Sequence, residues 1–146
     1  MITLDAYFMG RNVTHAEEFT DEILTHATIT VGKVNELLAR AGRSDIHRVT
    51  SGWRPRSVND ATSNAAANSR HLTGQAADLS DNDRNLCGWC VDNLDVLTEI
   101  GLWMEDPRWT PTWLHVQTVP PKSGKHVFIP STAPAKDPSF PVTWIA

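Results

Sequence analysis

One ten-residue window contains two residues that could bind a metal ion. Residues 69–78 read SRHLTGQAAD, so His71 stands seven positions before Asp78. In one continuous helix the two side chains would lie about 10 Å apart along the axis. In one continuous strand they would lie about 23 Å apart on opposite faces. Neither geometry brings both to about 2 Å from one ion, so the chain must bend between them, and Gly74 permits the bend.

A catalytic zinc site needs a third protein ligand and an open position for water. Residues 113–118 are expected to form a strand, in which alternation places His115 on one face with Trp113 and Gln117. His115 is therefore well placed to supply that ligand. Four further histidines have no comparable partners, and we expect them to be ordinary polar residues: His15, His26, His47 and His126.

The elements that must position these residues occur in mixed order, which indicates an α+β fold. Thr20 is a good N-cap type, and the apolar spacing from Ile23 to Ala41 predicts a helix of about twenty residues that stops at Gly42. The other expected elements are a helix at 86–100, short strands at 46–51, 101–105, 113–118 and 126–129, and either a short helix or a loop at 59–68.

Three segments resemble one protein family. The window Ser69-x-His71-x-x-Gly74-x-Ala76-x-Asp78 resembles the SxHxxGxAxD motif of the zinc D,D-peptidases that share their fold with hedgehog signalling domains. SGWR at 51–54 is similar to that family's SG(Y/W)R segment, and WLHV at 113–116 to its late WxH strand. The resemblance spans roughly residues 46–118. It implies a small antiparallel sheet with flanking helices, in a single metallopeptidase domain over 1–146 with its motif-bearing core at about 20–130 and a proline-rich tail.

The resemblance also implies roles for individual residues. Zn²⁺ would be bound by His71, Asp78 and His115, the residues already considered for a metal site. Arg54 matches an arginine in the family's substrate site, where a guanidinium can hold a carboxylate or an oxyanion. Ser69 would be a hydrogen-bonding residue near the substrate, and Trp113 is expected beside it.

A carboxylate general base is the remaining part of such a site. Many members of the resembled family carry Asp or Glu three residues before the late histidine, where this chain has Thr112. Hedgehog-like members place a Glu at the end of the preceding strand, and Glu105 ends the segment 102–105 in a comparable way. We therefore expect Glu105 to be the base, with Asp106 as the alternative.

The resemblance therefore implies a zinc metallopeptidase that hydrolyses peptidoglycan stem peptides at a bond involving a D-amino acid, as a carboxypeptidase or an endopeptidase. The alternative is a non-catalytic metal-binding or virion structural module on the same fold. We expect a monomer that acts on the cell wall. A catalytic domain of this size suits a phage or prophage lytic enzyme as well as a bacterial one.

The CxxC segment Cys87-Gly88-Trp89-Cys90 suggests a third hypothesis, a thiol–disulfide protein. A thioredoxin places this motif directly after a strand, whereas here it follows the polar segment 81–85. We favour a pair of cysteines packed on a helix.

Composition restricts the partners. The chain has 146 residues with 13 basic and 17 acidic side chains, a net charge of −4, and therefore no basic field for nucleic acid or an anionic membrane. No uncharged stretch fits a transmembrane helix. The N-terminus lacks the basic and apolar regions of a secretory signal, which predicts synthesis in the cytoplasm. A chain of this length can bury about 68% of its unfolded surface, enough for a core without disulfides.

Overall fold

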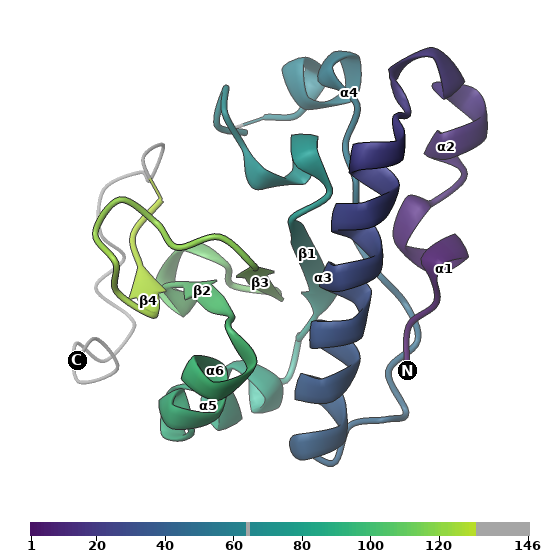
Figure 1. Ribbon diagram of the computed structural model, residues 1–146. Coiled ribbons are helices and arrows are strands. Elements are labelled where there is room, and N and C mark those ends of the chain that lie inside the picture. Colours follow the sequence, from purple (N-terminus) through teal and green to yellow (C-terminus); the bar gives the residue numbers. More distant parts are fainter. Residues whose placement is uncertain (64, 131–146) are drawn as a thin grey trace.

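A four-stranded sheet with helices packed around it forms the centre of the computed structural model, which describes residues 1–63 and 65–130 (Figure 1). The sheet order is β1-β3-β2-β4. Its strands are β1 (Ala76–Ser80), β2 (Trp103–Glu105), β3 (Trp113–Gln117) and β4 (Val127–Phe128). β3 pairs antiparallel with both β1 and β2, and β4 adds parallel to β2. Mixed helices and a small, mainly antiparallel sheet confirm the predicted α+β class.

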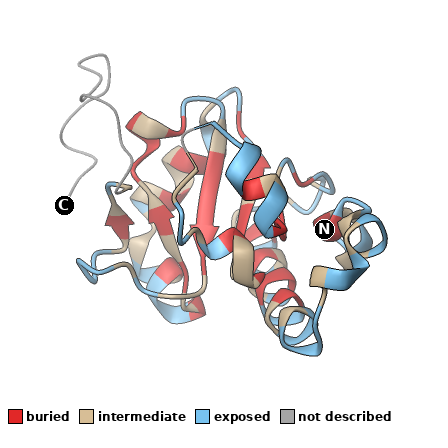
Figure 2. Cartoon of the chain, turned by 90° about the horizontal axis from the view of Figure 1, so that it is seen from above, coloured by how far each residue is buried: buried red, intermediate tan, exposed pale blue. Residues whose placement is uncertain are grey.

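Helix α3 (Asp21–Arg40) confirms the first predicted helix. Thr20 caps it, because its hydroxyl accepts a hydrogen bond from the Ile23 amide at 3.2 Å. The helix ends at Arg40 with Ala41 as its C-cap, and Gly42 follows with φ +67°. The buried side of α3 faces β1 and the helix that precedes β2. Figure 2 shows buried residues, in red, both in the sheet and on one side of α3. The buried apolar residues of α3 are Ala27, Val31, Val34, Leu37 and Leu38.

The helix expected at 86–100 is two helices, α5 (Asn85–Asp92) and α6 (Leu94–Ile100). They separate at Asn93, whose side-chain amide donates to the Trp89 carbonyl at 2.8 Å. In a continuous helix that carbonyl would accept from the Asn93 backbone N–H, which instead donates to Cys90 at 3.1 Å. Competition from a side-chain amide therefore ends α5.

The segment 46–51 does not form the expected strand. Only Ser51 makes a β-bridge, to Asp78, so this segment touches the free edge of β1 at a single position. The chain leaves the sheet at Gly52, where an added Cβ would lie 1.9 Å from the Tyr7 carbonyl oxygen. In the region read as helix or loop, helix α4 (Arg56–Ala61) forms ahead of a turn.

Three short helices precede α3 without a counterpart in the sequence-based prediction. They are α1 (Leu4–Phe8), α2 (Arg11–Thr14) and the 3-10 helix η1 (Ala16–Glu18). None is long enough to show helical periodicity, but α1 is held to the sheet because the Tyr7 hydroxyl donates to the Ala76 carbonyl at 2.7 Å. Phe19 packs edge-on against Phe8 and Trp53.

The two late strand predictions at 101–105 and 113–118 are confirmed by β2 and β3, and β4 lies within the predicted segment 126–129. Most of the proline-rich tail, residues 131–146, lies outside the described residues. Within the described chain, no helix has the length and apolar character that crossing a bilayer requires.

Candidate metal centre

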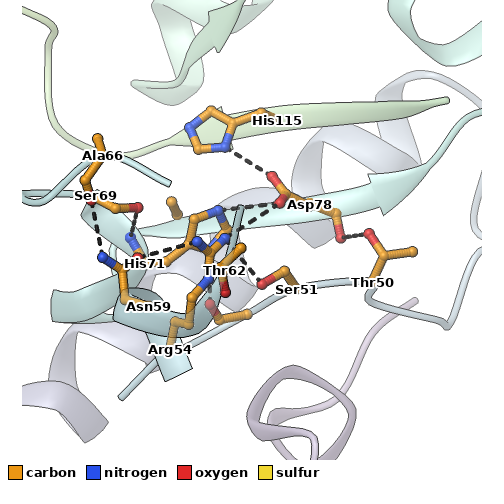
Figure 3. Close-up of polar contacts among 12 residues, drawn as sticks. Thr50, Ser51, Arg54, Asn59, Thr62, Ala66, Ser69, His71, Asp78 and His115 are labelled. Atoms are coloured by element: carbon orange, nitrogen blue, oxygen red, sulfur yellow. Dashed lines mark hydrogen bonds and ion pairs between the residues drawn. The ribbon is translucent and has the colours of Figure 1, made fainter. Parts of the chain in front are cut away.

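His71, Asp78 and His115 converge from three separate elements. His71 lies in the 3-10 helix η2 (Arg70–Thr73), Asp78 in the middle of β1 and His115 in the middle of β3. One potential ligand atom from each residue lies within 4.8 Å of the other two. Figure 3 shows the Asp78 carboxylate between the two imidazole rings. The structure thus brings together the three residues that the sequence predicted as metal ligands.

The bend between His71 and Asp78 occurs at Gly74, as predicted. η2 stops there because Gly74 adopts a left-handed conformation with φ +76°, and β1 begins two residues later. Upstream, the Ser69 hydroxyl caps η2 by accepting a hydrogen bond from the His71 amide at 3.3 Å. The helical turn and the glycine together turn His71 back towards Asp78.

The sheet register places further side chains in the same row. Asp78 of β1 pairs with His115 of β3. The β2–β3 register pairs Trp103 with Gln117 and Met104 with Val116, so Glu105 comes opposite His115. Neighbouring positions in paired strands point to the same face. Asp78, His115 and Glu105 therefore form one row across three strands.

Each imidazole directs one nitrogen to the Asp78 carboxylate. His71 Nε2 lies 3.3 Å from Asp78 Oδ2, and His115 Nδ1 lies 2.8 Å from Oδ1. The other nitrogen of His71, Nδ1, donates to the Gly52 carbonyl at 2.8 Å. Because a carbonyl only accepts, this bond leaves the lone pair of Nε2 directed at the cluster.

The charged groups of the cluster change one another's pKa values. Burial alone would raise the pKa of Asp78, but the neighbouring His71 and His115 hold it well below its usual range. For His115, burial lowers the pKa, yet the Glu105 charge and the bonded Asp78 outweigh this and raise it to about 9. The ionised carboxylate and the two imidazoles together form a set of donors. A divalent cation can bind to this set by displacing a proton.

Arg54 lies against the same carboxylate and is 8% exposed. Its Nη2 atom is 3.9 Å from Asp78 Oδ2 and donates to Ser51 Oγ at 3.4 Å. Nη1 donates to Asn59 Oδ1 at 3.1 Å, and Asn59 in turn donates to the Ala66 carbonyl. Burial lowers the pKa of Arg54, while Asp78 and Glu105 oppose the shift. The guanidinium is thus fixed beside the cluster.

A cleft of about 1030 Å³ opens above the three candidate ligands. Every residue that the sequence assigned to the substrate side lines it, namely Arg54, Ser69, Trp113 and Glu105. The sequence did not single out Phe128, which pairs with Glu105 in register and packs edge-on against His115 at 6.1 Å between ring centroids. Trp109 also lines the cleft, whereas Trp103 stacks on His126.

Comparison with protein families gives one match. The family model described as Peptidase M15 matches residues 7–91, which is more than half of the chain and includes His71 and Asp78. This chain belongs to the Peptidase M15 family. Members are zinc D,D-peptidases, and the observed sheet and helices fit their hedgehog/D,D-peptidase fold. No curated protein and no solved structure matches the chain in the two other comparisons.

The two carboxylates considered for the base of this M15 family member have different surroundings. Glu105 faces the cleft. Asp106 is fully buried, and Arg108 donates to it from Nε at 3.0 Å and from Nη2 at 2.6 Å. Asp106 also caps a 3-10 turn by accepting from the Arg108 amide. Asp106 therefore has a structural partner for both oxygens, while Glu105 is directed at the candidate site.

The CxxC pair lies in helix α5 and is buried, with both thiols free. Burial raises the pKa of Cys87, and it raises the pKa of Cys90 to about 12. The adjacent Asp81 carboxylate accepts from the Leu86 and Cys87 amides and so caps α5. Reactive cysteines have lowered pKa values and some exposure, so the structure favours the packed-pair interpretation over thiol–disulfide chemistry.

Three of the other histidines have described contacts outside the cluster. Their Nδ1 atoms contact the Thr14 hydroxyl for His15, the Thr73 carbonyl for His26 and the Leu102 carbonyl for His126.

Proposed function

We propose that this protein is a zinc peptidase that hydrolyses peptidoglycan stem peptides at a bond involving a D-amino acid. The observation that carries the proposal is the convergence of His71, Asp78 and His115 beneath a large cleft. Two imidazole nitrogens and one carboxylate oxygen, with an open fourth position, are a donor set typical of catalytic zinc. Membership of a zinc D,D-peptidase family supports the choice of metal and of substrate class.

When bound, zinc lowers the pKa of a water molecule towards about 7 and polarises the scissile carbonyl. Glu105 accepts the proton of the attacking water and passes it to the leaving amine as the C–N bond breaks. Its place opposite His115 in the sheet supports this role over Asp106.

The substrate is held by the cleft walls. Arg54 offers parallel N–H donors to a substrate carboxylate or to the developing oxyanion. Its bonds to Asn59 and Ser51 fix the guanidinium, so little side-chain freedom is lost on binding. Ser69 supplies a polar contact and Trp113 an apolar wall. The protein acts as a monomer on the cell wall, and a phage or prophage lytic enzyme is one setting that this activity fits.

Mass spectrometry of fragments released from purified sacculi tests the proposal. Zinc-loaded protein is expected to release peptides with new ends at a D-amino acid, and the fragment masses distinguish a carboxypeptidase from an endopeptidase. A chelator should stop the release, and added zinc should restore it.

Glu105→Gln is the matching variant. It should lower the hydrolysis rate by about 10²–10⁴-fold, the contribution expected of a general base, and leave one zinc bound per chain. Glu99→Gln, at an exposed carboxylate paired with Arg40, is the control and should keep wild-type activity. Zinc-loaded wild-type protein that releases no fragment would contradict the proposal and favour the non-catalytic module.

A further inference from the structure

Gln117 lies two residues after His115 on the same face of β3 and is 6% exposed. Its side-chain amide lies between the His115 ring and the Val119 backbone. β3 is flanked by β1 and β2, and Gln117 pairs with Ala76 on one side and Trp103 on the other. The sheet therefore fixes the backbone of Gln117 beside His115 on this face.

The contact with Val119 decides which way the amide points. Gln117 Nε2 donates to the Val119 carbonyl oxygen at 2.7 Å, and a carbonyl cannot donate in return. The amide oxygen is thereby directed at His115 Nε2, 3.2 Å away, where it can only accept. Nε2 of the ring therefore carries a proton. His115 Nδ1, which faces Asp78, is then the nitrogen whose proton a cation can displace.

We propose that Gln117 is a positioning residue of the metal centre, which fixes the tautomer and ring orientation of His115 so that Nδ1 is the metal ligand. The proposal rests on the zinc site of the proposed function. His71 receives the same support from the Gly52 carbonyl, a backbone group that no substitution removes. At His115 the support comes from a side chain and can be tested.

The residue beside Gln117 is consistent with this role. Ala76 of β1 pairs with Gln117 and presents only a methyl group towards it, so the amide has room between His115 and Val119. The small size of Ala76, in the window 69–78, therefore leaves space for the amide that contacts His115.

Three variants separate the contributions. Gln117→Leu keeps a side chain of similar size and removes the acceptor, whereas Gln117→Glu keeps an oxygen acceptor for His115 Nε2–H. Gln75→Leu makes the same amide-to-alkyl change at the other glutamine of the chain, whose Oε1 accepts from Thr73 away from the cluster.

Zinc affinity is measured at neutral pH by competition with a chromophoric chelator. Loss of an outer-shell partner of a ligating histidine typically weakens affinity about 10–100-fold, the result expected for Gln117→Leu. Gln117→Glu keeps the acceptor for His115 but cannot donate to the Val119 carbonyl, so it should weaken affinity less. Gln75→Leu should stay close to wild type. Circular dichroism of each metal-free variant checks that the fold is kept. Wild-type affinity in Gln117→Leu would overturn the proposal while leaving the zinc site intact. A wild-type chain that binds no zinc would instead refute the proposed function and the role of Gln117 with it.

Nitrogen-15 NMR of the histidine rings in zinc-loaded protein tests the tautomer directly. We expect His115 with its proton on Nε2 and its metal bond at Nδ1, and a mixed or inverted pattern in Gln117→Leu. A zinc bond at Nε2 in the wild-type protein would overturn the proposal.

Discussion

The His71–Asp78–His115 cluster and the Cys87–Cys90 pair both contain side chains of types that can bind a metal, and both are largely shielded from solvent, yet their surroundings are opposite. In the cluster, charged and polar partners offset burial: the pKa of Asp78 falls and that of His115 rises to about 9. The cysteines belong to the hydrophobic core, and burial there keeps them protonated, with the pKa of Cys90 raised to about 12. Partners, and not burial alone, make a group chemically active.

The same contrast separates two adjacent carboxylates at the end of β2. Glu105 faces the cleft, and Asp106 points into the interior and pairs with Arg108. Glu105 is therefore accessible from the cleft, and Asp106 stabilises the loop before β3. Substitutions in each set test whether cleft-facing and interior groups differ as these surroundings require.

The largest effect is expected for Asp78→Asn. This change keeps the size of the side chain and removes the negative charge that joins both imidazoles, so zinc affinity should fall by more than the roughly 100-fold upper range for losing an outer-shell partner. Hydrolysis should be lost with it. Asp92→Asn, at an exposed position of α5, is the control. Chelator competition measures both, and Asp78→Asn with wild-type zinc affinity would refute the ligand assignment.

Asp106→Asn should act on stability. Removing one partner of a buried ion pair leaves the Arg108 charge uncompensated and costs about 3–5 kcal/mol of unfolding free energy. Urea denaturation measures this change. The fraction of zinc-loaded Asp106→Asn that stays folded should keep the wild-type pH profile of hydrolysis. A stable Asp106→Asn protein without activity would transfer the role of base from Glu105 to Asp106.

Alkaline pH should destabilise the fold through the interior groups. Unfolded cysteines and tyrosine ionise near their ordinary pKa values of 9.0 and 10.0, whereas burial raises the pKa values of Cys87, Cys90 and Tyr7 in the folded chain. The unfolded state then binds fewer protons, so the unfolding free energy falls above pH 9, by up to about 1.4 kcal/mol per pH unit for each retained proton.

His115 also makes the unfolding free energy of the metal-free protein fall as the pH rises, but over a lower pH range than the thiols and Tyr7. Its stabilising contribution is complete below pH 6.5 and is lost as the pH rises to about 9.

The variant Cys90→Ala isolates the thiol contribution, because its stability should fall less steeply above pH 9 than that of the wild type. Parallel slopes for the two proteins in urea titrations would contradict the assignment.

The variants Cys87→Ala and Cys90→Ala should have the smallest effect on zinc binding and hydrolysis. Zinc affinity and hydrolysis should match the wild type, because neither thiol lines the cleft among the described residues. Each change should cost about 1 kcal/mol of stability from lost packing. Loss of activity in both variants, with His71→Ala still active, would favour thiol chemistry.

The sequence was informative where a local rule decides the structure. Gly74 had to bend the chain, and Thr20 had to cap α3, whatever the rest of the fold. Alternation in β3 likewise placed His115 and Gln117 on one face. These features depend on backbone conformation and on neighbours in the chain.

Features that depend on distant partners could not be predicted in this way. Glu105 opposes His115 only through the β2–β3 register, and the two helices around Asn93 reflect a single side-chain amide. The single bridge at Ser51 depends on how closely Gly52 approaches Tyr7 in α1. The partners of Gln117 required the folded positions of both His115 and Val119.

X-ray absorption spectroscopy of the zinc-loaded wild-type chain tests the central claim most directly, because it distinguishes the two groups of possible ligands. Binding at His71, Asp78 and His115 predicts only nitrogen and oxygen neighbours at about 2.0–2.2 Å, with the outer scattering of two imidazole rings. A sulfur neighbour at about 2.3 Å would place the metal at the cysteines and contradict the account.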